Sequence, residues 1–263
     1  MKIGIAISTY TQENTNPERY KIIEKSLQSL NKINNQNTKY SLYITIVIDG
    51  EIPIIHKNLL DKFSFNIYQR KTNGGVAKTK NTSIKLLLNE NVDIGFLADD
   101  DIEYKTGILE KYVDTIKLGN IHHIGFCQMH PLVHPKNEWE KMGYIKSKYN
   151  NVEVMKHGGG GVGCWLSFTP ELIKKIGYFK VMAGKYGYEH INFTLRSIYH
   201  KMIPFAMDII NPLEYIDHIG FEPMSYNKYK KSHSISEDYR IIENKKNKEI
   251  YKLDLDKYIK IKE

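Results

Sequence analysis

The sequence predicts an α/β protein in which helices flank a mostly parallel sheet. Short runs rich in β-branched residues alternate along the chain with segments whose apolar residues recur at helical spacing. Several of the expected strands stop at polar or glycine residues, as strands do at the sheet edge where ligands bind. The alternation predicts the fold class, and the strand ends indicate the region of a site.

The first half of the chain gives the clearest elements. Residues 3–7 form a continuous apolar run, as expected for a strand that is buried on both faces. Asn16 and Pro17 then supply an N-cap and a first-turn proline for a helix. Further along, we expect strands at 43–48, 65–69 and 94–97 and helices at 76–88 and 108–116.

The pattern becomes less regular after residue 120. We expect further strands at 121–128, 162–168 and 203–209 and helices at 170–176 and 188–199. The 263 residues suit one large domain, which we place at 1–222. Residues 223–263 are then a basic C-terminal extension that packs on this domain or trails from it.

Composition narrows the classes of function. The chain has 38 Lys and Arg against 30 Asp and Glu, a net charge of +8, but most of the excess is lysine near the C-terminus. We therefore expect a solvated surface and not a nucleic-acid-binding face. Cys127 and Cys164 are predicted to be reduced core thiols. Without a signal-peptide pattern or an apolar stretch of about 18 residues, the expected compartment is the cytoplasm of a cell or of an infected host.

An acidic cluster follows the strand expected at 94–97. Asp99, Asp100 and Asp101 stand side by side, and their carboxylates repel one another unless a cation neutralises them. Alternate side chains of an extended segment share a direction, so Asp99 and Asp101 can face the same ligand. The alternative is an acidic turn that caps the next helix.

The order of motifs around this cluster resembles the GT-A glycosyltransferases over residues 1–220, especially family 2 and its relatives that transfer galactose or N-acetylgalactosamine. The resemblance implies a Rossmann-like fold and an Asp-x-Asp motif that binds a divalent metal, usually Mn²⁺, with Mg²⁺ as the alternative. Asp99 and Asp101 match this motif, and Asp99 and Asp100 are expected to contact the donor. Ala98 stands where many relatives have an acidic residue, which leaves a register of Asp100 and Asp101 open.

The resemblance also implies a nucleotide-binding region, with UDP as the expected nucleotide. Ser8, Thr9, Tyr10 and Asp49 match positions where the family holds the base and the ribose. A carboxylate can accept the imide hydrogen of uracil, and an aromatic ring can pack on the base. Asp49 beside Gly50 can equally be a turn residue.

A second donor segment precedes the helix expected at 76–88. Asn73, Gly75 and Lys78 belong to a stretch that resembles the family's segment after its third strand. Glycine lets the backbone approach a ligand, and a lysine at a helix N-terminus suits an anionic group. A plain loop is the alternative.

The expected acceptor side follows a tract of four glycines at 158–161. Such a tract has a large ordering cost, which is tolerated where the backbone must approach a ligand. By resemblance, Gly160, Gly161 and Trp165 lie between the donor and acceptor sites, with Trp165 as a sugar-stacking surface. A linker followed by a core tryptophan is the other interpretation.

The general base is expected at the start of the helix at 188–199. Glu189 and His190 resemble the family's Gly-x-Glu-Asp motif, whose second acidic residue commonly acts as the base. Histidine stands at that position here, so either residue can be the base. We favour Glu189, because it is ionised at neutral pH, although a Glu in a first helical turn can merely complement the helix dipole.

A third metal ligand is expected late in the chain, where related enzymes often supply a histidine. His218 is the candidate and His233 its rival, while His130 and His134 form a spaced pair that lacks a third zinc ligand.

The sequence thus favours a metal-dependent glycosyltransferase that moves a sugar from a nucleotide donor to a hydroxyl of a glycan, glycolipid or protein, with inversion. The alternatives are a nucleotidyltransferase and a non-catalytic basic binding module. No nucleic-acid partner is expected, and the sequence does not indicate the oligomeric state.

Overall fold

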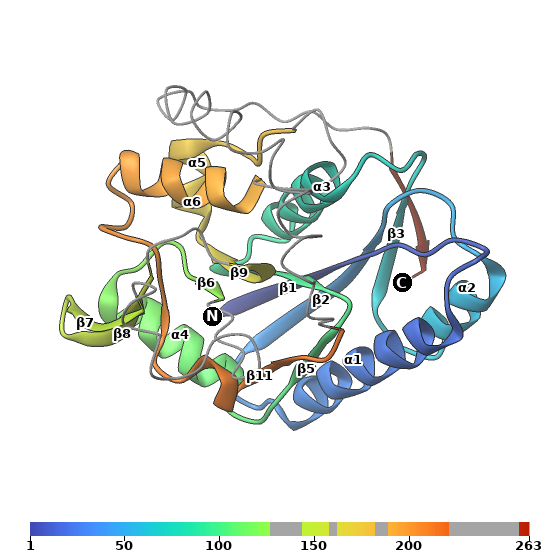
Figure 1. The fold of residues 1–263 in the computed structure, drawn as a ribbon, viewed down its shortest axis with the longest axis horizontal. Helices are drawn as coiled ribbons and strands as arrows, with labels where there is room; N and C mark the ends of the chain where they lie inside the picture. Colours follow the sequence, from blue (N-terminus) through green and yellow to red (C-terminus); the bar gives the residue numbers. More distant parts are fainter. Residues whose placement is uncertain (127–143, 158–161, 182–188, 221–257, 263) are drawn as a thin grey trace, which may run out of the picture.

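A computed structural model describes residues 1–126, 144–157, 162–181, 189–220 and 258–262 (Figure 1). The elements in chain order are β1 (Lys2–Thr9), α1 (Pro17–Gln36), β2 (Ser41–Ile48), α2 (Ile54–Leu60), β3 (Asn66–Arg70), α3 (Val76–Asn89), β4 (Ile94–Asp99), β5 (Ile102–Tyr104), α4 (Ile108–Gly119), β6 (Gly125–Phe126), β7 (Ile145–Tyr149), β8 (Val152–Lys156), β9 (Val162–Phe168), α5 (Pro170–Ile176), α6 (Glu189–Tyr199), β10 (Met207–Ile209), the 3₁₀ helix η2 (Pro212–Glu214), β11 (Ile216–His218) and β12 (Tyr258–Lys262).

The main sheet has seven strands in the described residues, in the order β12-β3-β2-β1-β4-β9-β6. Strands β3, β2, β1 and β4 run parallel to one another, whereas β9 and β12 are antiparallel to their neighbours. The prediction of an α/β fold with a mostly parallel sheet is confirmed.

Helices cover both faces of this sheet, which gives three layers (Figure 1). Alternate residues of β1 explain the arrangement: Ile5 and Ile7 pack in the core with α1 and α4, whereas Ala6 packs in the core with α3, α5 and α6. A strand that is buried on both faces must be apolar throughout, as residues 3–7 are.

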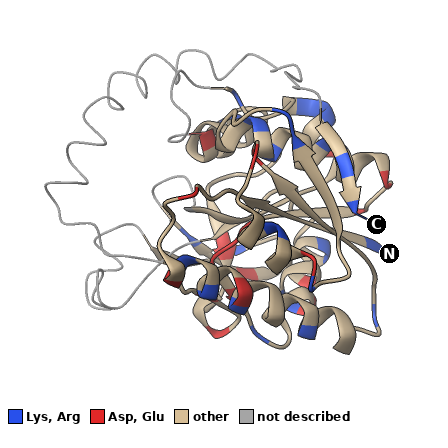
Figure 2. Cartoon of the chain, turned by 90° about the vertical axis from the view of Figure 1, so that its right-hand side faces the viewer, with Lys and Arg blue, Asp and Glu red and all other residues tan. Residues whose placement is uncertain are grey.

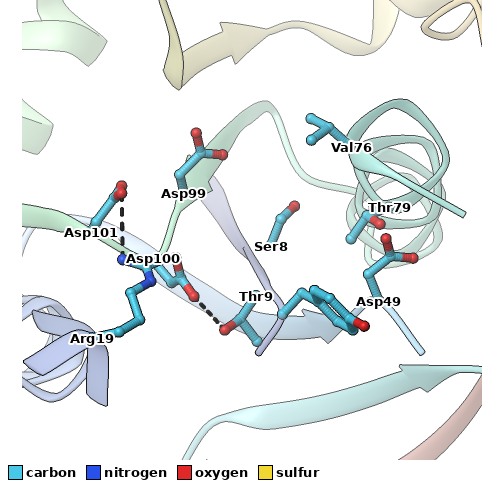
Figure 3. Close-up of a pocket in the computed structure, with 10 residues that line it drawn as sticks. Ser8, Thr9, Arg19, Asp49, Val76, Thr79, Asp99, Asp100 and Asp101 are labelled. Atoms are coloured by element: carbon cyan, nitrogen blue, oxygen red, sulfur yellow. Dashed lines mark hydrogen bonds and ion pairs between the residues drawn. The ribbon is translucent and has the colours of Figure 1, made fainter. Parts of the chain in front are cut away.

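The start of α1 follows the capping chemistry of the sequence. The side chain of Asn16 accepts a hydrogen bond of 3.0 Å from the backbone N–H of Glu18, and Pro17 is the first helical residue. This cap places Arg19 in the first turn of α1, close to the carboxyl end of β4 (Figure 3).

Late and short elements differ from expectation. The strand expected at 121–128 is described only as β6, with residues 127 and 128 outside the described part, and the one expected at 203–209 is confined to β10. Unpredicted elements are α2, β5, β7, β8, η2, β11 and β12. Strand β12, from the expected extension, pairs with β3 and so adds an edge strand to the main sheet.

The surface carries both signs of charge. Figure 2 shows basic and acidic residues interspersed over the outer helices of the described chain. Ion pairs such as Lys62–Glu24 (2.8 Å) and Lys2–Glu90 (2.9 Å) join several of them. Among the described residues, no helix combines the length and the apolar character required to cross a membrane.

The expectation that Trp165 stacks on a sugar is wrong. Its side chain is completely buried and stacks on Phe96 with ring centroids 4.6 Å apart. Tyr104 and Tyr112 meet it edge-on from β5 and α4. Trp165 lies on a central strand of the sheet, so the apolar pattern of β9 places it in the core and leaves no face for a ligand.

We therefore predict that Trp165→Ala lowers the free energy of unfolding by about 3–5 kcal/mol, because it leaves a large cavity in a packed aromatic cluster. Trp165→Phe should cost clearly less, since it keeps a ring on Phe96. Urea denaturation of both variants measures this. An alanine variant of unchanged stability but weakened acceptor binding would contradict the core assignment.

Candidate functional site

A cavity of about 230 Å³ lies at the carboxyl ends of β1, β2 and β4 (Figure 3). Its wall consists of residues from these strand ends, from α1 and from the start of α3: Ser8, Thr9, Tyr10, Arg19, Asp49, Val76, Thr79, Asp99, Asp100 and Asp101. The strand register explains the gathering, because Ser8 on β1 lies directly opposite Asp99 on β4. Most of the predicted donor residues are thus brought together, whereas Asn73, Gly75 and Lys78 lie outside the wall.

Cations of the chain itself neutralise the three aspartates. Lys80 Nζ lies 3.0 Å from Asp99 Oδ1. Arg19 spans the other two carboxylates, with one nitrogen bonded to Asp100 and the other 3.4 Å from Asp101 Oδ2. Neither cation was predicted from the sequence. A usable signal existed for Lys80, which stands among apolar residues on the buried stripe of α3 with Ala77 and Ile84.

The aspartates differ in their electrostatics. Burial raises the pKa of Asp100 to about 6, against the opposing effect of Arg19, and repulsion from Asp101 adds to the rise. Burial alone would also raise the pKa of Asp101, but His218 and Arg19 together hold it below its ordinary value. At neutral pH the third aspartate is therefore the more firmly ionised of the two.

His218, the expected third metal ligand, lies beside the acidic cluster. Strand β11 pairs with β5 so that His218 stands opposite Ile102, and the backbone N–H of Ile219 donates to the Asp101 carbonyl at 3.0 Å. This pairing brings His218 Nε2 to 3.3 Å from Asp101 Oδ1. The rivals His130, His134 and His233 lie outside the described residues.

Asp49 organises the loop that precedes α3. Its carboxylate accepts hydrogen bonds from Arg70 Nε at 3.0 Å and from the backbone N–H groups of Gly74 and Gly75 at 3.0 and 2.8 Å. Gly75 has φ of +85°, a backbone conformation that favours glycine. The turn role of Asp49 is therefore observed, and its place in the cavity wall keeps a second role open. Lys78 contributes its carbonyl, which accepts from Arg70 at 3.1 Å.

Glu189 and His190 form a hydrogen-bonded pair at the start of α6. His190 Nε2 lies 2.9 Å from Glu189 Oε1, and the Glu189 side chain is nearly fully buried. Burial would raise the pKa of Glu189, but His190 and Lys80 lower it to about 2. His190 Nδ1 is buried and has no hydrogen-bond partner among the described residues.

A glycine makes room for the histidine ring. A Cβ atom on Gly163 would lie only 1.9 Å from His190 Nε2, so any side chain at this position would displace the imidazole. The same glycine offers its carbonyl oxygen to Lys80 Nζ, which also pairs with Asp99. Lys80 thus connects the aspartate cluster with the Glu189–His190 pair. Gly160 and Gly161, the other expected acceptor-side residues, lie outside the described residues.

Comparison with known proteins identifies the family. No family model matches the chain. An uncharacterized glycosyltransferase of Acanthamoeba polyphaga mimivirus is 40% identical over 219 residues, which cover 82% of this chain and 80% of the relative. The chain belongs to the glycosyltransferases.

Solved structures agree on the fold of this glycosyltransferase. Residues 1–349 of S. aureus TarS in complex with UDP-GlcNAc match with a TM-score of 0.54 at 17% identity, over 89% of this chain and 65% of that one. A second structure of the same TarS segment matches with a TM-score of 0.50 at 18% identity, over 74% and 54%. The glycosyltransferase spans less than two thirds of each of these structures. It has the GT-A fold, as the resemblance implied.

Behind the cavity of the glycosyltransferase, a buried histidine supports the aspartates. His56 of α2 lies 2.8 Å from Thr11 Oγ1 through Nδ1 and 3.2 Å from Thr9 Oγ1 through Nε2. Thr9 in turn donates to Asp100. Burial, with a contribution from Arg19, lowers the pKa of His56 to about 4. No sequence pattern singled out this residue.

The lowered pKa predicts a pH dependence of stability. An unfolded histidine takes up a proton near pH 6.5, whereas folded His56 resists protonation until about pH 4. Its contribution to stability is therefore present above pH 6.5 and is lost as the pH falls toward 4. Between pH 7.5 and 5, the wild type should lose about 2 kcal/mol more unfolding free energy than His56→Gln. Equal losses in urea titrations at the two pH values would contradict the assignment.

Proposed function

We propose that the enzyme transfers a sugar from a UDP-sugar donor to an acceptor hydroxyl, with a divalent cation at the donor site. The observation that carries this proposal is the continuous arrangement from the acidic cavity, through Lys80, to the Glu189–His190 pair. A sugar transfer needs these parts: a place for a nucleotide diphosphate and, beside it, a base for the acceptor. The UDP-GlcNAc bound in TarS supports the choice of nucleotide.

The cavity wall divides into two chemical halves. Ser8 and Tyr10 offer hydroxyl groups and one aromatic ring to a base and a ribose, and Thr9 and Asp49 stand beside them. The three aspartates form the opposite part, where the close-up shows Asp99 pointing away from Arg19 (Figure 3). We assign this acidic half to the diphosphate, which needs additional positive charge to bind there.

The acidic half fits a divalent cation that is shared with the donor. Asp101 Oδ1 is buried without a hydrogen bond of ordinary geometry in the described chain, and His218 Nε2 lies 3.3 Å from it. A carboxylate oxygen and an imidazole nitrogen this close together would fit the donor set of one divalent ion. Within the described residues, no three acidic or histidine side chains are grouped to hold a metal. Asp101 and His218 would hold the ion, and phosphate oxygens and water would complete it.

A cation in this position would supply charge neutralisation to the departing diphosphate. The choice of Mn²⁺ over Mg²⁺ follows from His218, because an imidazole ligand suits a borderline ion better than a hard one. Asp99 pairs with Lys80. In this scheme Asp99 contacts the donor and, through Lys80, connects β4 with β9.

The pair at α6 provides the base, and its geometry favours His190. Glu189 is buried and its low pKa makes it a poor proton acceptor. As an ionised hydrogen-bond acceptor at 2.9 Å, it fixes Nε2 of His190 as the protonated nitrogen and leaves Nδ1 to take a proton. Because Nδ1 is buried in the ligand-free chain, the acceptor must uncover it on binding. The earlier preference for Glu189 as the base is therefore replaced by a pair in which Glu189 orients His190.

The proposed reaction is a single displacement. The acceptor oxygen attacks the anomeric carbon, the bond from that carbon to the phosphate oxygen breaks, UDP leaves, and the acceptor proton passes to His190 Nδ1. Such a displacement inverts the anomeric centre. A glycan, glycolipid or protein hydroxyl can serve as the acceptor.

The first test measures donor binding. We expect Mn²⁺ with a UDP-sugar to raise the melting temperature more than either alone, and more than DNA or RNA does. Asp101→Asn should abolish the joint effect while the fold is retained, because it removes the negative charge of a ligand and not a core group. A screen of donor hydrolysis across sugar nucleotides then identifies the sugar. Stabilisation by nucleic acid alone would favour a binding module instead.

The second test concerns the base. His190→Ala should lower kcat by about 10²-fold or more with donor affinity retained, and added imidazole should partly restore turnover. His190→Asp, which restores the acidic residue of the related motif, should retain more activity than the matched His190→Asn. Glu189→Gln should be less damaging than His190→Ala, because it keeps a hydrogen-bond acceptor for the ring. A Glu189→Gln variant that is inactive beside an active His190→Ala would reverse the assignment.

A further inference from the structure

Arg19 stands apart from the other cations near the aspartates. It lies in the first turn of α1, and its side chain keeps 29% of its surface exposed, whereas the side chain of Lys80 is completely buried. Arg19 also lines the cavity, where its guanidinium lies beside Asp100 and Asp101 (Figure 3). A ligand in the cavity can therefore reach Arg19.

The two terminal nitrogens of Arg19 contact different carboxylates. One is bonded to Oδ1 of Asp100, and the other lies 3.4 Å from Oδ2 of Asp101. Asp100 is almost fully buried and could not keep a charge there without such a partner. The fork of a guanidinium suits this double contact, which a lysine could not reproduce.

Arg19 and the proposed metal use opposite oxygens of the same carboxylate. Arg19 is next to Asp101 Oδ2, whereas His218 and the open ligand position are next to Oδ1. Both cations can thus be present together, but each reduces the negative charge that attracts the other. Arg19 consequently weakens metal binding even though it does not occupy the metal position.

We propose that Arg19 is a built-in cation of the donor site, which opposes metal binding to the empty enzyme and attracts the diphosphate of the donor. This inference rests on the proposed function. In the absence of a ligand, Arg19 offsets the mutual repulsion of Asp100 and Asp101. When a nucleotide enters, its phosphate oxygens bring the negative charge that makes the metal and Arg19 compatible in one site. Metal and nucleotide then bind cooperatively, because the charge of each ligand offsets the charge that opposes binding of the other.

The proposal predicts that one variant binds Mn²⁺ more tightly and UDP more weakly. Arg19→Gln should bind Mn²⁺ alone about tenfold more tightly, because a competing positive charge is gone. The same variant should bind UDP in the presence of EDTA about tenfold more weakly, because the cavity wall has lost its charge. If Arg19 had a purely structural role, Arg19→Gln would weaken both Mn²⁺ binding and UDP binding.

Lys21→Gln is the matched control. It removes one positive charge from the same helix turn, but Lys21 is exposed and pairs with Glu18 at 2.7 Å, away from the cavity wall. This control should leave both affinities within about twofold of the wild type, because surface charges are screened by salt.

Titration calorimetry or Mn²⁺ electron paramagnetic resonance measures metal binding, and calorimetry with EDTA measures UDP binding, so neither readout needs activity. Arg19→Lys tests the charge if Arg19→Gln does not fold, and it should bind Mn²⁺ within about threefold of the wild type. Equal loss of both affinities in Arg19→Gln, or changes no larger than those of Lys21→Gln, would overturn the proposal for Arg19. A wild type that binds neither Mn²⁺ nor UDP would instead overturn the proposed function itself.

Discussion

A buried lysine fixes the acidic cavity and the Glu189–His190 pair relative to each other. Lys80 has no exposed surface, yet it joins the Asp99 carboxylate of β4 to the Gly163 carbonyl of β9. A buried charge is costly unless it is paired and hydrogen-bonded, so the positions of both partners are strongly constrained. The acidic cavity and the Glu189–His190 pair consequently keep a fixed relation, although they are about 90 residues apart in sequence.

The carboxylates illustrate a conflict between stability and function. Three adjacent aspartates at a strand end repel one another, and the chain offsets that repulsion with Arg19, Lys80 and His218. All three aspartates nevertheless line the cavity, so these pairings do not remove them from its wall. A fully apolar replacement would remove the repulsion but also the proposed cation site and the proposed contacts with the donor.

The sequence predicted what is encoded locally and missed what depends on distant pairing. The strands β1 to β4 and the cap of α1 follow from apolar runs, from Asn16 and from Pro17, so their existence and their polar ends were predictable. Trp165 was misassigned because an aromatic residue after a glycine tract is compatible with a sugar-stacking surface and with a core position alike, and the structure places it in the core. Arg19 and His56 carried no local signal, since only the packing of α1 beside the end of β4 and of α2 beside the end of β1 gives them their partners.

The histidine in place of an acidic residue changes what its surroundings must provide. A carboxylate base needs only partial desolvation, whereas an imidazole must be held in one tautomer and needs room for a ring. Glu189 at 2.9 Å supplies the first requirement, and Gly163, which tolerates the close approach of the ring, supplies the second. Because the Gly163 carbonyl is itself bound by Lys80, the ring is supported by the same residue that holds Asp99. In the proposed mechanism, the exchange at position 190 therefore works only together with Glu189, Gly163 and Lys80, which orient the imidazole, make room for it and hold the strand beside it.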